Sequence, residues 1–393
     1  MKLSQRVQKL AESATLAVSA KAAAMKKQGV DVVSFGAGEP DFPTPEHIRA
    51  AAKAALDAGH TGYAKPTSGI PEAKQAVCAK LKRENQLDYE PSQVLITVGG
   101  KEALYLACMA VLDEGDEVIL PAPYWVTYPE QVKLCGARTV VIEGRESSGY
   151  KMTAEQIAGA ITERTRVLIF NSPSNPGGFT YSPDQVKAIA DVVADRDLLV
   201  FSDEMYDRLI YRDQRFMSFA AAGPRAYAQA LTFNAGSKTY AMTGWRVGYV
   251  AGPEPIIKAM AKLQSQTTSG TATFNQHGLV EALNGDQQPA EQMRREFEGR
   301  AEYMYERLNG LAGVRCVRPT GAFYAFPNVS DAYARLGVAG SVDFSAKVLE
   351  EAHVALVPGV AFGMDAHVRL SFATSMAQIK KGLDRLEELL GKA

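Results

Sequence analysis

The middle of the chain alternates short apolar runs with segments of helical periodicity. The runs that we interpret as strands are residues 93–98 (QVLITV), 117–120 (EVIL), 167–170 (VLIF), 198–201 (LLVF) and 231–233 (LTF). A helix is predicted from about Lys101 to Leu112, and two capping boxes, at Thr153-x-x-Gln156 and at Ser182 to Gln185, mark further helix starts. Strands and helices that alternate at this spacing predict a mostly parallel sheet covered by helices on both faces.

The pattern changes after about residue 280. Helical periodicity covers residues 291–308 and 343–351, and residues 321–326 and 368–373 are predicted strands. A last helix, residues 375–390, places Ile379, Leu383, Leu386 and Leu390 on one face. We therefore expect an α/β protein with a large domain (46–280) and a smaller α+β domain (281–393), with residues 1–45 forming an N-terminal arm and part of the small domain.

Composition narrows the class of protein. The 393 residues are 46% hydrophobic and 22% charged, with a formal net charge of -1, and no basic arm of the kind that binds nucleic acid stands out. Polar residues interrupt every apolar stretch near the N-terminus, which argues against a signal peptide or membrane span. The four cysteines and five histidines lack metal-binding spacing, so we expect no metal site and a reducing, cytoplasmic setting.

The segment from Asn234 to Tyr249 (NAGSKTYAMTGWRVGY) holds the most informative chemistry. Lys238 follows an apolar strand within a run of small residues, and Arg246 comes eight residues later. A lysine held in a pocket beside cations loses its proton more readily and can then attack a carbonyl, whereas most lysines are simply exposed. Arg246 could return to the same pocket and bind a phosphate.

Polar groups also follow the other predicted strands. In an open parallel sheet, ligands collect outside the carboxyl ends of the strands, so these loops should converge. Gly99-Gly100-Lys101 begins a helix whose backbone N–H groups can hold a phosphate. The remaining loops supply aromatic rings at residues 124–125, amide donors within 171–178, and Asp203, which could pair with a protonated ring nitrogen.

With these residues, the sequence resembles the class I aminotransferases of fold type I, nearest to the bacterial aspartate aminotransferases of the prokaryotic subgroup. The resemblance spans essentially the whole chain. The matching segments are AGEPDF (37–42), YAKPTSGIPEAK (63–74), VGGKEAL (98–104), PAPYW (121–125), NSPSNPGG (171–178), SDEMY (202–206), SKTYAMTGWRVGY (237–249) and VRLSFAT (368–374). The order and spacing of so many motifs make coincidence negligible.

The resemblance implies pyridoxal 5'-phosphate as cofactor, bound to Lys238 as a Schiff base. Asp203 is expected to pair with the ring nitrogen, which makes the ring an electron sink, and Tyr206 is the third catalytic candidate. The other implied cofactor contacts come from Gly100, Lys101, Trp125, Asn175, Ser237 and Arg246. Tyr63 is expected to reach the phosphate of a neighbouring subunit, which implies a homodimer with shared active sites.

Substrate contacts are also implied by the resemblance. Arg369 is expected to bind the α-carboxylate, with help from Gly38, Trp125 and Asn175. Lys101, Ser13 and Thr15 are the candidates for recognising the side-chain carboxylate of aspartate.

Each residue has a simpler interpretation when taken alone. Asp203 could be a helix N-cap, Trp125 a core residue, Arg369 half of a surface ion pair, and Lys101 a solvated residue in a first helical turn. The sequence also departs from the usual motif at Ser174 and Gly178, and residues 11–12 (Ala-Glu) lack the basic residue that helps bind prephenate in some relatives.

The predicted reaction is a ping-pong transamination of L-aspartate with 2-oxoglutarate through a Lys238 aldimine. The alternatives are a broader aminotransferase that accepts aromatic amino acids, alanine or prephenate, and a lyase or synthase that uses the same lysine. A transcription regulator with an aminotransferase-like domain is disfavoured, because residues 1–45 are too short for a winged helix. Residues 36–41 (GAGEPD) lack the third glycine of a dinucleotide-binding fingerprint.

Overall fold

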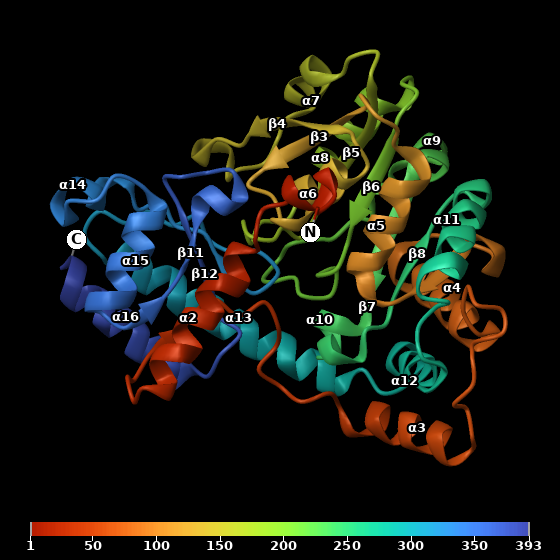
Figure 1. Ribbon diagram of the computed structural model, residues 1–393, viewed down its shortest axis with the longest axis horizontal. Helices are drawn as coiled ribbons and strands as arrows, with labels where there is room; N and C mark the ends of the chain where they lie inside the picture. The colour runs from red at the N-terminus through yellow and green to blue at the C-terminus, as the bar shows by residue number, and fades with distance from the viewer. Residues whose placement is uncertain (1, 392–393) are drawn as a thin grey trace.

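A seven-stranded sheet forms the centre of the computed structural model, which describes residues 2–391 (Figure 1). The strand order is β2-β8-β7-β6-β5-β3-β4. The strands are β2 (Val94–Thr97), β3 (Glu117–Ala122), β4 (Arg138–Glu143), β5 (Thr165–Asn171), β6 (Leu199–Asp203), β7 (Ala230–Ala235) and β8 (Gly248–Ala251). β8 alone runs in the direction opposite to the other six strands, so the predicted mostly parallel sheet is confirmed.

The interior strands were predictable because they are buried along nearly their whole length. Every residue of β7 is buried, and β5 and β6 are buried at all but two and one of their positions, respectively. Strands covered on both faces favour continuous apolar runs. Two strands of this sheet were missed: β4 is an edge strand that mixes exposed and half-buried positions, and β8 is an exception, because it was not predicted although all four of its residues are buried.

Helices pack against this sheet and connect its strands. They are α3 (Glu46–Asp57), α4 (Pro71–Asn85), α5 (Gly99–Val111), α6 (Thr127–Leu134), α7 (Ala154–Ala160), α8 (Pro183–Ala194), α9 (Pro224–Gln229), α10 (Gly236–Thr239), α11 (Glu254–Thr267) and α12 (Thr273–Asn284). Both predicted capping boxes are present, at Thr153 and at Ser182. The helix expected from Lys101 begins two residues earlier, at Gly99.

The C-terminal part contains two smaller sheets. Its helices are α13 (Gln288–Asn309), α14 (Tyr333–Leu336), α15 (Ser341–Glu351) and α16 (Met376–Leu390). Strands β11 (Val357–Pro358), β12 (Val368–Ser371) and β9 (Tyr324–Ala325) form an antiparallel sheet. The four apolar side chains predicted for one face of α16 are all buried. The strand expected over 321–326 is only two residues long, because Ala322 adopts a positive φ of 56°.

The N-terminal segment lies against this C-terminal part. It contains α1 (Gln5–Gln8), α2 (Ala14–Lys27) and β1 (Val33–Ser34), and β1 pairs in parallel with β10 (Val354–Ala355). Ala22 of α2 packs in a buried cluster with Leu349 and Ala355. Figure 1 accordingly shows the red α2 beside the blue C-terminal elements.

The exact domain boundaries stay a prediction, since one continuous apolar core links the two parts of the described chain. Residues 1 and 392–393 of the predicted divisions lie outside the described residues. Among residues 2–391, no helix is both long and apolar enough to cross a membrane.

Candidate active site

A cavity of 560 Å³ opens where the carboxyl ends of the large sheet face the N-terminal segment and the C-terminal part. Nearly all of the predicted site residues line it: Ser13, Thr15, Gly38, Gly100, Lys101, Trp125, Asn175, Asp203, Tyr206, Ser237, Lys238, Arg246 and Arg369. A second cavity of 560 Å³, between Phe42 and Glu296, contains none of them. The sequence prediction that the strand-end loops converge is therefore confirmed.

Tyr63 is the one predicted site residue that lies elsewhere. Its side chain is 81% exposed, and it lines a different cavity together with residues 268–274. The role predicted for Tyr63 requires a second subunit, so it stays a prediction.

Asp203 ends β6 at the floor of the site cavity. Its side chain is buried, accepts a hydrogen bond of 2.6 Å from the Tyr128 hydroxyl, and accepts a second from the Met205 backbone N–H. Burial raises the pKa of Asp203, while the bond from Tyr128 opposes that shift. Asp203 caps no helix, and this buried carboxylate would readily pair with a cationic ring nitrogen.

Lys238 lies in α10, directly after β7, and its amine reaches into the same cavity. The surrounding protein removes most of the solvent around the ammonium, and this desolvation lowers the pKa of Lys238 to about 8. Arg369 and Arg246 lower the pKa further, while Glu39 and Asp203 oppose the shift. The ammonium donates a hydrogen bond of 2.5 Å to the Gly38 carbonyl. A lysine so disposed to lose its proton is suited to nucleophilic attack and to proton transfer.

The start of α5 and the Arg246 guanidinium form one side of the cavity. Gly99 has a φ of +74°, and a Cβ there would lie 2.5 Å from Nη2 of Arg246. A Cβ on Gly100 would lie 2.1 Å from Cε of Met205. The positive φ at Gly99 favours glycine, and the absence of side chains at both positions lets Arg246 and Met205 pack closely at the N-terminus of this 13-residue helix, with Ser237 lining the same cavity. Free N–H groups, a helix dipole and a guanidinium together suit a phosphate.

Arg369 lies in β12 with its side chain 1% exposed. Nη1 donates to Oδ1 of Asn175 at 3.1 Å, and Nη2 donates to the Gly36 carbonyl at 3.0 Å. Within the described residues, Nε has no hydrogen-bond partner and no carboxylate forms an ion pair with this guanidinium. The interpretation of Arg369 as half of a surface ion pair is wrong; it is a buried fork suited to a small carboxylate.

Lys101 and Trp125 lie together at the wall of the cavity. The Lys101 ammonium is 5.0 Å from the centre of the Trp125 ring, and burial followed by the charge of Arg246 lowers the pKa of Lys101. Lys101 as a whole residue is still exposed, so the solvated first-turn interpretation holds for part of the side chain. Trp125 is half-buried and borders the cavity as well as the core.

Two aromatic residues at the site were missed by the sequence prediction. The Tyr128 hydroxyl holds Asp203, and the hydroxyl of Tyr324 lies 3.0 Å from that of Tyr206. The Tyr324 ring also lies against the Arg369 guanidinium, 4.6 Å from its central carbon. Tyr128 lies in the first turn of α6, three residues after Trp125, and the two rings pack edge to face with their centres 5.4 Å apart.

The chain belongs to the class I and II aminotransferases, because the model of that family matches residues 30–386. It is 47% identical to an aspartate aminotransferase of Geobacillus stearothermophilus, over 99% of each chain. It is 43% identical to a probable aspartate/prephenate aminotransferase of Aquifex aeolicus, over 99% of this chain and 98% of that one.

Solved structures agree with this assignment. An aspartate aminotransferase of Thermus thermophilus, solved with maleate, is 42% identical and superposes with a TM-score of 0.93, over 99% of this chain and 100% of that one. A Rhizobium meliloti aspartate aminotransferase has a TM-score of 0.94 at 41% identity, over 98% of both chains. The chain is thus a fold-type I aminotransferase related to the prokaryotic aspartate aminotransferases.

Membership of this family implies pyridoxal phosphate, and the donor set fits that group. A lysine of lowered pKa faces the cavity, a buried carboxylate lies at its floor, and the glycine-lined start of α5 meets Arg246. These are the groups that an aldehyde, a pyridinium nitrogen and a phosphate require. Among the described residues, no set of three or more His, Cys, Asp or Glu side chains is arranged to hold a metal ion.

Proposed function

We propose that this enzyme transaminates L-aspartate with 2-oxoglutarate, giving oxaloacetate and L-glutamate. The observation that carries this proposal is that the cavity has two further cations besides Lys238 and Arg246: Arg369, buried without an ion-pair partner among the described residues, and Lys101 beside Trp125. Two separate carboxylates, one at each end of a substrate, would match them. Maleate, present in the Thermus thermophilus structure, is also a dicarboxylate.

Arg369 would bind the α-carboxylate of the amino acid. Its planar fork can hold both carboxylate oxygens, and the free Nε supplies a donor that the protein itself leaves unused. The hydrogen bonds to Asn175 and Gly36 fix the plane of the guanidinium. The α-carbon is thereby held in a defined position relative to Lys238.

Lys101, Ser13 and Thr15 would contact the side-chain carboxylate. Ser13 and Thr15 lie at the start of α2, on the N-terminal side of the cavity, and Lys101 lies in the first turn of α5. A charged group in this position favours acidic side chains over alanine or phenylalanine by Coulomb attraction.

Pyridoxal phosphate, when bound, supplies an electron sink for the electrons of the α-carbon. Nζ of Lys238 would take the α-proton and later return a proton, which its lowered pKa favours near neutral pH. Asp203, held by Tyr128, would keep the cofactor's ring nitrogen protonated. Ser237, Arg246 and the start of α5 would hold the phosphate, Trp125 would stack on the ring, and Asn175 and Tyr206 would bond its phenolic oxygen.

A wider substrate range is the second candidate, because several relatives are named aspartate/prephenate aminotransferases. Residues 11–12 of this chain are alanine and glutamate, without a basic side chain for the extra carboxylate of prephenate. This favours aspartate. We also propose a homodimer in which Tyr63 completes the partner's site.

Single half-reactions test the substrate. Holoenzyme is mixed with one amino acid at a time, and conversion of the cofactor absorbance to that of the amine form is followed. Rapid conversion by aspartate and glutamate, with slow conversion by alanine and phenylalanine, is expected. Equal conversion by all four would overturn the dicarboxylate proposal, and added prephenate as acceptor tests the second candidate.

A further inference from the structure

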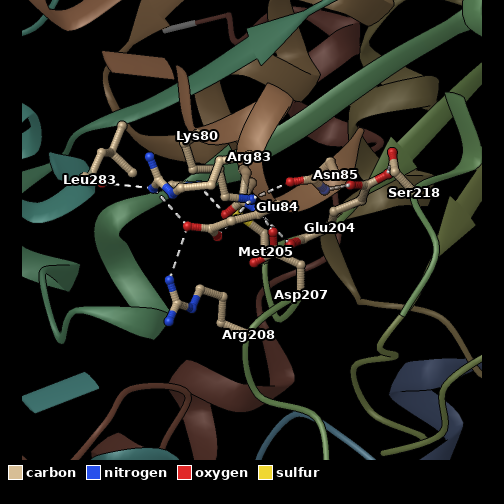
Figure 2. Close-up of polar contacts among 12 residues, drawn as sticks. Lys80, Arg83, Glu84, Asn85, Glu204, Met205, Asp207, Arg208, Ser218 and Leu283 are labelled. Atoms are coloured by element: carbon tan, nitrogen blue, oxygen red, sulfur yellow. Dashed lines mark hydrogen bonds and ion pairs between the residues drawn. The ribbon is translucent and has the colours of Figure 1, made fainter. Parts of the chain in front are cut away.

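Figure 2 shows a cluster of polar side chains that includes Lys80, Asn85, Glu204 and Asp207. The end of α4 contributes Lys80 and Asn85, and the segment after β6 contributes Glu204 and Asp207. All four residues are buried, with Lys80 2% exposed and Glu204 1% exposed. Neither Lys80 nor Glu204 lines the site cavity.

The hydrogen bonds that connect Lys80, Asn85 and Glu204 are donated in one direction, from Lys80 toward Glu204. Lys80 donates to Oδ1 of Asn85 at 2.7 Å, and Nδ2 of Asn85 donates to Oε2 of Glu204 at 3.1 Å. An ammonium can only donate, so Lys80 fixes which way the Asn85 amide points. The amide must then present its N–H group to Glu204. We call Lys80, Asn85 and Glu204 the Lys80–Glu204 relay.

The side-chain carboxylate of Glu204 accepts hydrogen bonds from four donors. Besides Asn85, its donors are Ser202 at 2.8 Å, Ser218 at 2.6 Å and the Phe219 backbone N–H at 3.3 Å, all to Oε1. A carboxylate that faces only donors is held in its ionised form. Burial works against this and raises the pKa of Glu204 to about 7, while the bonds from the two serines and the charge of Lys80 lower it. The four donors therefore fix the position of this carboxyl group, while burial and the charge of Asp207 oppose its ionisation.

Along residues 203–207, residues that line the cavity alternate with residues that are bound to α4. Asp203 and Tyr206 line the cavity, whereas Glu204 and Asp207 are bound by Asn85 and Lys80 of α4, respectively. Asp207 forms an ion pair with Lys80, and the Glu204 carbonyl accepts a bond of 2.9 Å from Asn234 of β7. Lys80 is thus linked to the segment 203–207 at two points, directly at Asp207 and through Asn85 at Glu204.

We propose that the Lys80–Glu204 relay is a positioning device that sets the orientation of Asp203 and Tyr206 toward the cofactor ring. Lys80 and Glu204 act through the backbone of residues 203–207 and touch neither substrate nor cofactor. This inference rests on the proposed function in one respect: the turnover measurements take aspartate as the substrate.

The test compares Glu204→Gln and Lys80→Met with a matched control, Glu117→Gln. Glu117 is also a fully buried carboxylate on the same sheet, bonded by Arg138, Arg164 and Thr162, but it does not line the cavity. Ser218→Ala is a milder variant, because it removes one of four donors to Glu204. The holoenzyme form of each is examined.

Two readouts separate positioning from stability: the pH titration of the absorbance of the lysine-bound cofactor, and kcat against KM for aspartate. We expect Glu204→Gln and Lys80→Met to raise the apparent pKa of the cofactor absorbance, because a displaced Asp203 holds less positive charge on the ring. We expect kcat to fall by roughly tenfold with little change in KM, as for outer hydrogen-bond partners of other functional groups. Ser218→Ala should shift both in the same direction but less, and Glu117→Gln should shift neither.

If the relay variants lose thermal stability like the control but keep the wild-type titration and kcat, the relay is only structural and the proposal is wrong. If Glu204→Gln and Lys80→Met do not fold, the pH titration and kcat of Ser218→Ala test the proposal, and wild-type values of both would contradict it. A wild-type enzyme that binds the cofactor but fails to transaminate aspartate would overturn the proposed function. The cofactor titration would still test the relay in that case.

Discussion

Two groups of charged residues at opposite ends of the large sheet's strands differ in how their charges are satisfied. At the start of β3, Glu117 is fully buried and accepts hydrogen bonds from Arg138, Arg164 and Thr162, which lower its pKa to about 2. At the carboxyl ends of the strands, Lys238 and Arg369 lack any ion-pair partner among the described residues, and desolvation lowers both pKa values.

The difference separates a structural ion cluster from a site prepared for a ligand. Both carboxylate oxygens of Glu117 accept hydrogen bonds from the protein, so its charge already has its partners. The cavity instead contains the Arg369 guanidinium, whose Nε has no partner among the described residues, and the Lys238 amine, whose pKa is lowered to about 8. Buried groups left unsatisfied cost stability, and they are tolerated where a substrate or cofactor supplies the missing partner.

Lys238→Ala tests this contrast with the largest expected effect. Without the amine there is neither an attachment point for the cofactor nor a base at the α-carbon, so kcat should fall by about 10²–10⁴-fold or more. Steady-state assays with aspartate and the loss of the lysine-bound cofactor absorbance measure this. A variant with substantial activity would remove Lys238 from its proposed role.

Arg369→Lys should have the next largest effect. Lysine keeps the charge but loses the planar fork, which is not a conservative change at a bidentate site. We expect kcat/KM for aspartate to fall by roughly 30-fold or more, equivalent to about 2 kcal/mol. Unchanged kcat/KM for both aspartate and alanine would show that Arg369 does not bind the α-carboxylate.

Lys101→Gln sharpens the contrast within the cavity. Because Lys101 is partly solvated, its charge should contribute about fivefold to kcat/KM for aspartate. Alanine, which has no side-chain carboxylate, should react as well with the variant as with the wild type. An equal loss for both amino acids would instead assign Lys101 to the cofactor.

Glu117→Gln should leave turnover unchanged and lower stability. The carboxylate has a depressed pKa, so its contribution is present above about pH 4.5, the ordinary value, and is lost as pH falls toward 2. Melting curves at pH 7 should show a less stable variant, and the gap from wild type should close as the pH falls through that range. A marked fall in kcat would show that the Glu117 cluster affects the active site, and the contrast between the two groups of charges would then be wrong.

The sequence predicted the interior of this molecule better than its edges. Buried strands such as β5 and β7 were visible as apolar runs, while the edge strand β4 had no comparable signal, and β9 was predicted within a longer run, 321–326, of which it takes only two residues. The site loops were found because each follows a predicted strand. Tyr128 and Tyr324 were missed, since their roles depend on contacts with Asp203 and Tyr206 that only the folded chain creates. The same holds for Lys80, a buried lysine with no sequence pattern that distinguishes it from an exposed one.

The central claim is that Lys238, which has no ion-pair partner among the described residues, is the lysine that captures the cofactor. The most direct measurement mixes cofactor-free enzyme with pyridoxal phosphate over a range of pH, reduces the product with borohydride, and maps the labelled peptide. We predict label at Lys238, with an initial rate that rises with pH and levels off above about pH 8, because only the neutral amine reacts. Label at Lys101 or another lysine, or a rate that keeps rising toward the ordinary lysine pKa of about 10.4, would contradict the account.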